Sequence, residues 1–441
     1  MKAYVKTFGC QMNEHESERM RGLLLGVGYA LAPDEEDADF ILINTCSIRE
    51  KAEQKAFSYL GRLKLRKDKR PDLKIGVCGC IAQREGRRII RRAPHVDVIF
   101  GTKNVHRLPR LIERMEKTHD RVIEICDDDS VRWQQFDCEI KRDSRVSAWV
   151  TIMQGCDNYC TYCVVPYVRG REWSRPKDEI LAEISELAAL GYKEITLLGH
   201  NVNSYGRGLS QDCDFPGLIR SIDKIGGIER IRFTTSHPKD FSEKLVEAIA
   251  DCPKVCEHIH LPFQSGSDKI LMSMNRKYTT AEYLNKVKML RDRVPEAAIT
   301  SDVIVGFPGE DEEDFQKTLH LIESVQFEGL FTFLYSTRPQ AAAGNFARQI
   351  PNSIKQKRFE ILLEIQNRIS SERNMALLGT QQEILVEDAE ENEKSFRPLC
   401  RGRTRLNKIV EFTGSSDLIG KLERVTISRA NRFNLEGVIV P

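Results

Sequence analysis

The chain has 441 residues, of which 41% are hydrophobic and 30% are charged. These proportions are typical of a globular protein, and the length predicts two to four domains at roughly 150 residues each. No stretch approaches the roughly 20 apolar residues of a membrane span and the N-terminus has no apolar signal core, so we expect a cytoplasmic protein without membrane contact. The net charge is only +2, and any single basic run is typical of a solvated helix face, but several such runs in one chain also suggest a polyanionic partner.

Strand-like and helix-like stretches alternate over the first part of the chain. Apolar runs that predict strands lie at residues 2–8, 39–45, 73–79 and 96–101. Because helical stretches separate them, the pattern predicts a doubly wound parallel sheet of the α/β class. We place this domain at residues 1–125, and we interpret the polar residues 126–145 as a linker.

One cysteine follows each of the first three predicted strands: Cys10, Cys46 and Cys80. The carboxyl ends of parallel strands meet at one edge of an open sheet, where such folds build their sites. We therefore expect these three thiols to share a site. Cys78 lies within its strand, which makes Cys80 the better ligand. The chain has 13 cysteines, and a reducing cytosol disfavours disulfides, so clustered cysteines favour metal binding or chemistry.

The second part of the chain repeats a strand followed by a helix. The expected strands are 147–153, 194–199, 230–235, 258–263, 298–307 and 330–335. This repeat predicts a partial (β/α)6 barrel of TIM type over residues 146–375, with its chemistry at the carboxyl ends of the strands. In the helix expected at 178–190, we predict that Leu181, Ile184, Leu187 and Leu190 belong to the core. Short strand patterns over residues 376–441 predict a small five-stranded β-barrel.

Three more cysteines, Cys156, Cys160 and Cys163, lie within eight positions directly after the first barrel strand. Three thiolates can hold three irons of a 4Fe–4S cube, which leaves the fourth iron without a protein ligand. An open coordination position on a metal is a place where a substrate or cofactor can bind. This spacing therefore favours a reactive cluster over a closed one.

The segment CDNYCTYC, residues 156–163, is similar to the signature of radical S-adenosylmethionine (SAM) enzymes. In that family SAM fills the fourth coordination position. The resemblance implies that the reduced cluster passes one electron to SAM and that the resulting 5′-deoxyadenosyl radical removes a hydrogen from an unreactive C–H bond. The alternative is a zinc site completed by a remote ligand such as His200 or His237.

Three other segments, 6–18, 44–55 and 79–83, resemble the N-terminal domain of the radical SAM methylthiotransferase family. The resemblance covers the whole chain, because a small β module of the TRAM type follows the barrel in that family. It implies that Cys10, Cys46 and Cys80 hold an auxiliary 4Fe–4S cluster whose open iron carries the sulfur to be inserted. It also implies two uses of SAM, as radical source and as methyl donor.

Within this family, FGCQMNE (8–14), GHNVNSYG (199–206) and residues 260–279 are similar to the MiaB type, which modifies tRNA. The implied reaction adds sulfur and a methyl group at C2 of N6-isopentenyladenosine beside the anticodon. Two alternatives stay open: methylthiolation of threonylcarbamoyladenosine, and a non-catalytic RNA-binding iron–sulfur protein. The enzyme would also need an electron donor and a sulfur donor, and nothing in the sequence demands more than a monomer.

Two further sets of residues are candidates for binding. Asn201, Ser236, Gln264 and Asp302 lie at or just past predicted strand ends, where they could contact SAM or be hydrogen-bonded structural groups. Arg401, Arg403, Arg405 and Lys408 surround a strand of the C-terminal module. Because a small barrel with a basic face can follow a phosphate backbone, we predict that these four residues bind RNA.

Overall fold

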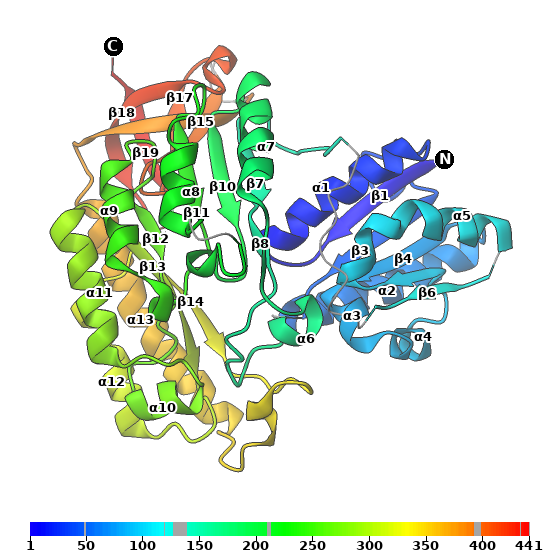
Figure 1. Cartoon of the computed structure of the whole chain (residues 1–441), viewed down its shortest axis with the longest axis horizontal. Helices are drawn as coiled ribbons and strands as arrows, with labels where there is room; N and C mark the ends of the chain where they lie inside the picture. Colours follow the sequence, from blue (N-terminus) through cyan, green and yellow to red (C-terminus); the bar gives the residue numbers. More distant parts are fainter. Residues whose placement is uncertain are drawn as a thin grey trace. The chain divides into compact units, whose positions relative to one another are not determined.

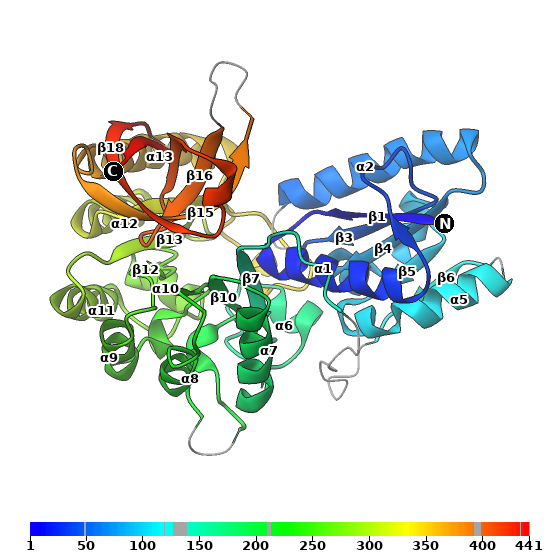
Figure 2. The same ribbon diagram turned by 90° about the horizontal axis from the view of Figure 1, so that it is seen from above.

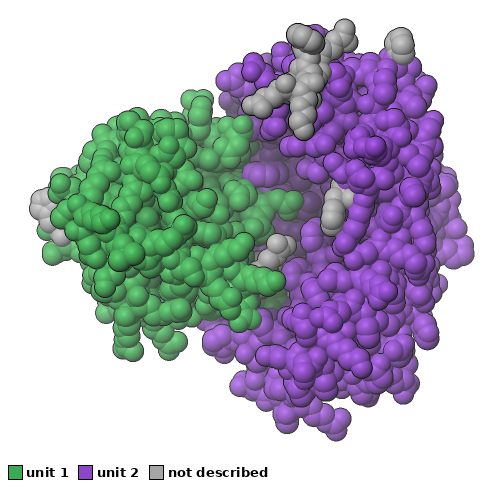
Figure 3. All heavy atoms as spheres, turned by 180° about the vertical axis from the view of Figure 1, so that it is seen from behind, with its two compact units in different colours: residues 1–143, 154–159, 163–173 green, residues 144–153, 160–162, 174–441 purple. Residues whose placement is uncertain are grey.

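The computed structural model of the chain describes residues 1–47, 50–118, 120–126, 139–209, 213–391, 398–432 and 434–440. Two compact units are coloured separately in Figure 3. Unit 1 contains residues 1–143, 154–159 and 163–173, and unit 2 contains residues 144–153, 160–162 and 174–441. No helix in the described ranges is long and apolar enough to cross a membrane. Residues 127–138 of the predicted linker lie outside the described residues, and our domain boundaries stay a prediction.

A parallel sheet with the strand order β2-β1-β3-β4-β5-β6 lies at the centre of unit 1 (Figure 1). Its four predicted strands are present as β1 (Lys2–Thr7), β3 (Phe40–Thr45), β4 (Lys74–Gly79) and β5 (Val98–Phe100). The sequence pattern does not predict the two edge strands, β2 (Ala30–Leu31) and β6 (Val122–Glu124). These strands have 2 and 3 residues, too few to show a period, whereas β5, also with 3 residues, lies within the longer apolar run 96–101.

Helices cover both faces of this sheet (Figure 2). Residues of α2 (Glu50–Lys69) form a core with Ile41 and Ile43 on one face. Residues of α1 (Gln11–Gly26) and α5 (Leu108–Thr118) form another core with Phe40 and Leu42 on the opposite face. Successive residues of a strand point to opposite faces, so a strand buried on both sides must be apolar throughout. The predicted doubly wound sheet is confirmed.

Six parallel strands in unit 2 correspond to the predicted barrel strands. They are β7 (Ser147–Thr151), β10 (Glu194–Leu198), β11 (Arg230–Phe233), β12 (His258–His260), β13 (Ala298–Val305) and β14 (Gly329–Leu334). They form two three-stranded sheets, ordered β11-β10-β7 and β12-β13-β14. A parallel bridge between Ile231 and Val255 lies at the junction of the two sheets. The partial barrel expected from the sequence is therefore confirmed.

Helices follow the barrel strands and enclose them (Figure 1). They are α7 (Lys177–Ala189), α8 (Phe215–Ile222), α9 (Glu243–Asp251), α10 (Asp268–Ser273), α11 (Thr280–Arg293), α12 (Glu312–Val325) and α13 (Asn352–Met375). The prediction for α7 is correct for Ile184 and Leu187, which are buried, but wrong for Leu190, whose exposure is 69%. The helix ends at Ala189, so Leu190 lies beyond the apolar face.

The C-terminal strands close into a five-stranded barrel with the order β15-β16-β17-β19-β18. They are β15 (Gln381–Glu390), β16 (Leu399–Thr404), β17 (Ile409–Thr413), β18 (Leu422–Ala430) and β19 (Leu435–Ile439). Two arginines of β11 connect this module to the larger barrel: Arg230 donates to Arg403 O (2.7 Å), and Arg232 donates to Thr404 O (2.7 Å). The predicted small β-barrel is confirmed, and it belongs to unit 2.

Candidate active site

The three cysteines predicted to share a site lie at the carboxyl ends of three neighbouring strands of unit 1. Cys10 follows β1 and is the N-cap of α1, Cys46 directly follows β3, and Cys80 is the first residue of α3 (Cys80–Glu85), directly after β4. Cys46 and Cys80 are buried, and Cys10 is partly exposed. Cys78 instead points into the core beside Met20, as its position within the strand predicts.

An amide pair supports the loops that carry these cysteines. The side chain of Asn13 donates to Asn44 Oδ1 (3.0 Å) and to Thr45 O (3.1 Å), and it accepts a hydrogen bond from the Cys10 thiol (3.4 Å). Gly79 has a φ of +88°, and a Cβ there would lie only 2.4 Å from Asn44 Oδ1. The turn that leads from β4 to Cys80 therefore requires glycine.

A buried cation accompanies the three thiols. Arg169, at the end of α6 (Val165–Arg169), forms a bidentate ion pair with Glu16 of α1, with Nη2 and Oε2 3.0 Å apart. A hydrogen bond from Cys46 lowers the pKa of Cys10 to about 6, against the effect of burial and with help from the charge of Arg169. Burial raises the pKa of Cys80, whereas Arg169 acts in the opposite direction. Sequence reasoning missed Arg169, because it lies 153 positions from Glu16.

The donor chemistry of this site fits an iron–sulfur cluster with one open iron. Three thiols and a buried cation are present, and sulfur is the ligand that such clusters use. Among the described residues, no group of three His, Cys, Asp or Glu side chains is arranged around a single metal ion. Thiolates that each bind a different iron of a cube stand farther apart than the ligands of one ion, so the two observations are compatible.

The second set of cysteines lies in the loop after β8 (Met153–Gln154). Cys156 and Cys160 are buried and Cys163 is partly buried. In unit 1, the backbone N–H of Cys156 donates to Gly170 O (3.3 Å), and the Cys163 sulfur accepts from the backbone N–H of Val165 (3.5 Å). In unit 2, the Cys160 sulfur lies 3.5 Å from Nη1 of Arg276. Sequence reasoning missed Arg276 as well.

Buried polar atoms that lack a partner gather after β10 and β11 of the barrel. They include Asn201 Oδ1, Ser236 Oγ and His237 Nε2, each without a hydrogen bond within the described part of the chain. Asn201 and Ser236 were predicted to contact a cofactor, whereas His237 was considered only as a zinc ligand. Since a buried polar atom without a partner is costly, these atoms fit a bound polar ligand such as SAM.

The other two predicted SAM contacts have different surroundings. Gln264 follows β12 and is buried with a φ of +67°, a conformation that glycine usually adopts. We predicted from the sequence that Asp302 lies at a strand end, but it lies in the middle of β13. Its carboxylate lies 3.5 Å from His260 Nε2. The strand expected at 298–307 already contains Asp302 in its interior, so the sequence pattern did not support placing this residue at a strand end.

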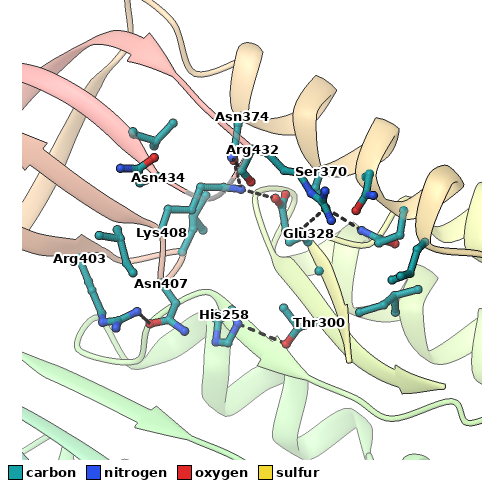
Figure 4. Close-up of a pocket in the computed structure, with 18 residues that line it drawn as sticks. His258, Thr300, Glu328, Ser370, Asn374, Arg403, Asn407, Lys408, Arg432 and Asn434 are labelled. Atoms are coloured by element: carbon teal, nitrogen blue, oxygen red, sulfur yellow. Dashed lines mark hydrogen bonds and ion pairs between the residues drawn. The ribbon is translucent and has the colours of Figure 1, made fainter. Parts of the chain in front are cut away.

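The four cations predicted to bind RNA all form ion pairs within unit 2. Arg401 pairs with Glu411 (2.9 Å), Arg403 with Glu387 (3.2 Å), Arg405 with Glu257 (2.6 Å) and Lys408 with Glu328 (2.6 Å). Arg403 and Lys408 also line a pocket of about 300 Å³ together with His258, Thr300 and α13 (Figure 4). RNA binding stays a prediction for all four, and Arg401, with a side-chain exposure of 45%, has the most accessible charge.

Two families match parts of the chain. Residues 2–101 match the Uncharacterized protein family UPF0004, and residues 150–322 match the Radical SAM superfamily. A curated tRNA-2-methylthio-N(6)-dimethylallyladenosine synthase from Carboxydothermus hydrogenoformans is 48% identical over 99% of both chains. The chain belongs to this synthase family. The family member from Acetivibrio thermocellus, of the same name, is 49% identical and covers 99% of this chain and 90% of its own.

A solved structure supports the fold of this family member. The radical S-adenosylmethionine methyltransferase TsrM from Kitasatospora setae, solved with cobalamin and a 4Fe–4S cluster, covers 78% of this chain and 77% of its own with a TM-score of 0.55. Its sequence identity is 13%, so this likeness concerns the fold alone.

Proposed function

We propose that the chain inserts sulfur and a methyl group at C2 of N6-dimethylallyladenosine (N6-isopentenyladenosine) beside the anticodon of tRNA. The observation that supports this most strongly is the 48% identity to the Carboxydothermus enzyme over 99% of both chains, because the name of that enzyme specifies the product. The match of the barrel to the Radical SAM superfamily supports radical chemistry at the unreactive C2–H. These findings do not favour threonylcarbamoyladenosine as the substrate, nor a non-catalytic role.

Each set of three cysteines has its own proposed task. Cys156, Cys160 and Cys163 would hold the 4Fe–4S cluster that the Radical SAM superfamily implies, and this cluster would supply the electron that cleaves SAM. Cys10, Cys46 and Cys80 would hold an auxiliary 4Fe–4S cluster at which the sulfur is provided. The support for the auxiliary cluster is the position of the three thiols at neighbouring strand ends beside Arg169.

Residues at the carboxyl ends of the barrel strands would bind and orient SAM. Burial and the nearby cation Arg276 lower the pKa of His237, so its ring is neutral at pH 7. Its Nδ1 accepts a hydrogen bond from the backbone N–H of Lys239 (3.2 Å), which leaves the proton on Nε2. His237 therefore offers a donor to SAM, whereas Asn201 Oδ1 offers an acceptor and Ser236 Oγ offers both.

The substrate that we propose is tRNA carrying N6-isopentenyladenosine, and SAM would serve as both radical source and methyl donor. The external electron donor, the sulfur donor, the monomeric state and the cytoplasmic location stay predictions. The C-terminal five-stranded barrel is the part of the chain that we propose to contact the RNA backbone, as small β-barrels do.

Two anticodon stem-loop RNAs would test this function. Protein with reconstituted clusters would be incubated without air with dithionite and SAM labelled in its methyl group. One RNA carries N6-isopentenyladenosine and the other carries threonylcarbamoyladenosine at the same position. We expect label only in the isopentenylated RNA, and label only in the threonylcarbamoyl RNA would overturn the proposal.

A further inference from the structure

The buried cation Arg276 lies beside one cysteine of the radical SAM loop. Its side chain is 4% exposed and makes four polar contacts within unit 2. Nη1 lies 3.5 Å from Cys160 Sγ and 3.3 Å from the Tyr162 hydroxyl. Nη2 donates to Pro262 O (2.9 Å), and Nε donates to the Tyr278 hydroxyl (3.1 Å). The guanidinium therefore has a fixed orientation, with one nitrogen directed at the sulfur.

Among the described residues, no carboxylate balances this charge. Within the described ranges, Arg276 forms no ion pair with Asp or Glu, and its neighbours are two tyrosines, a carbonyl group and Cys160. A buried cation without an anion is strongly unfavourable. Of the groups beside it, the thiol of Cys160 is the most acidic, and it is an anion when its thiolate binds iron. A Cys160 thiolate that binds iron would therefore balance the charge of Arg276 and explain its buried position.

The backbone places the two residues together. The backbone N–H of Thr161 donates to Met274 O (3.1 Å), and its hydroxyl donates to Ser273 O (2.9 Å). Asn275 and Lys277, on either side of Arg276, have φ values of +58° and +57°. Such left-handed conformations cost on the order of 1 kcal/mol or more each in residues other than glycine, and they persist where the surroundings require them. They direct Arg276 inward while Lys277 remains exposed.

We propose that Arg276 is a positioning residue that fixes Cys160 and raises the reduction potential of the 4Fe–4S cluster held by Cys156, Cys160 and Cys163. The inference rests on the proposed function, because it requires a cluster at these cysteines. Hydrogen bonds to ligand sulfurs and nearby positive charge are among the features that set cluster potentials. Because reduction adds negative charge to the cluster, an N–H donor with a positive charge stabilises the reduced state more than the oxidised one.

The test is a redox titration of the full chain monitored by electron paramagnetic resonance. Cys10→Ala, Cys46→Ala and Cys80→Ala are combined in the parent, so that only the radical SAM cluster contributes to the signal. Arg276→Met and Arg276→Lys are introduced into this parent. Lys277→Met is the matched control, because it removes the same charge from the neighbouring exposed residue without touching Cys160. Iron content and thermal unfolding show that each variant is loaded and folded.

We expect Arg276→Met to shift the ratio of reduced to oxidised cluster about tenfold at a fixed potential, which corresponds to 59 mV for a one-electron couple. The reduction potential of Arg276→Met should be lower than that of the parent. Arg276→Lys should have a potential between those of Arg276→Met and the parent, and Lys277→Met should have the parent potential. A loaded Arg276→Met variant with the parent potential overturns the role of Arg276. If Arg276→Met binds no iron, Arg276→Lys decides, and an unchanged potential in that variant overturns the inference. A parent that takes up no iron rejects the cluster and with it the proposed function.

Discussion

Arg169 and Glu16 form a buried bidentate ion pair beside the three cysteines of unit 1. Arg169 follows Cys163 by six positions, whereas Glu16 follows Cys10 by six positions, so the pair links the two segments that carry the two sets of cysteines. Burial opposes the charge of Arg169, but interactions with Cys80 and with the Glu16 carboxylate raise the pKa of its guanidinium well above the usual value. The guanidinium is thus a permanent cation beside the proposed auxiliary site.

Replacing this cation should destabilise unit 1. Arg169→Met leaves the Glu16 carboxylate buried without a partner, and breaking a buried pair in this way costs about 3–5 kcal/mol. Urea unfolding of the metal-free protein measures the loss. The double variant Arg169→Met with Glu16→Gln removes both charges, and we expect it to recover most of the stability. A single variant as stable as the parent would show that the pair contributes nothing.

The turn before Cys80 gives a prediction with a matched control. Gly79→Ala places a Cβ 2.4 Å from Asn44 Oδ1 and 2.4 Å from Thr45 O at a φ of +88°, and Gly28→Ala has the same φ with nothing within 4 Å. Both variants place alanine in a left-handed conformation that glycine tolerates better, which costs about 1 kcal/mol of stability. Gly79→Ala should lose about 1–3 kcal/mol more, because overpacking adds to it. Chemical denaturation compares the two, and equal losses would contradict the required close approach.

Glu310 should make stability depend on pH. Burial raises its pKa to about 7 from a usual value of 4.5, although Gly306 and Arg358 act against this. The folded chain therefore binds this proton more tightly than the unfolded chain. The resulting stability is fully present below pH 4.5 and is lost as the pH rises through about 7, with a total of about 3 kcal/mol.

The variant Glu310→Gln isolates this effect, because glutamine can still accept hydrogen bonds from Gly306 and Arg358 but does not titrate. The difference in free energy of unfolding between the variant and the parent should move in favour of the variant between pH 5 and pH 8. Urea denaturation at several pH values measures it. A difference that stays constant over this range would mean that Glu310 titrates near its usual pKa.

The cations of the β module should separate into two roles. Arg405 pairs with Glu257 and also donates to the backbone of Pro253 and Val255, so Arg405→Ala should cost about 1–3 kcal/mol of stability. Arg401 is more exposed, and its loss should change stability by less than about 1 kcal/mol. Arg401→Ala should instead weaken tRNA binding and reduce the salt dependence by about one unit of slope. Affinity measured at several salt concentrations tests this, and unchanged binding would remove Arg401 from the RNA surface.

The sequence predicts the architecture well, because the long apolar strands dominate its pattern. Runs such as 39–45 and 194–199 predict all six barrel strands and four of the six strands in the sheet of unit 1. Burial on both faces leaves such strands apolar throughout, which makes them visible without any alignment. The prediction fails for β2 and for the buried role of Leu190, where the element is short or the helix has ended.

The site is only partly predictable. Cys10, Cys46 and Cys80 could be placed together, because the ends of parallel strands share one edge of the sheet. Arg169 and Arg276 could not be placed at their sites, because each contacts a residue more than a hundred positions away and no sequence pattern indicates the contact.

The most direct test compares Cys10→Ala and Cys156→Ala with the parent in one reaction. Each reconstituted protein is incubated with dithionite, SAM and isopentenylated tRNA, and both 5′-deoxyadenosine and the digested nucleosides are measured by mass spectrometry. The account predicts that the parent forms the 2-methylthio nucleoside, that Cys10→Ala forms none but still yields 5′-deoxyadenosine, and that Cys156→Ala yields neither. Full methylthiolation by Cys10→Ala would contradict the proposed separation of tasks between the two sets of cysteines.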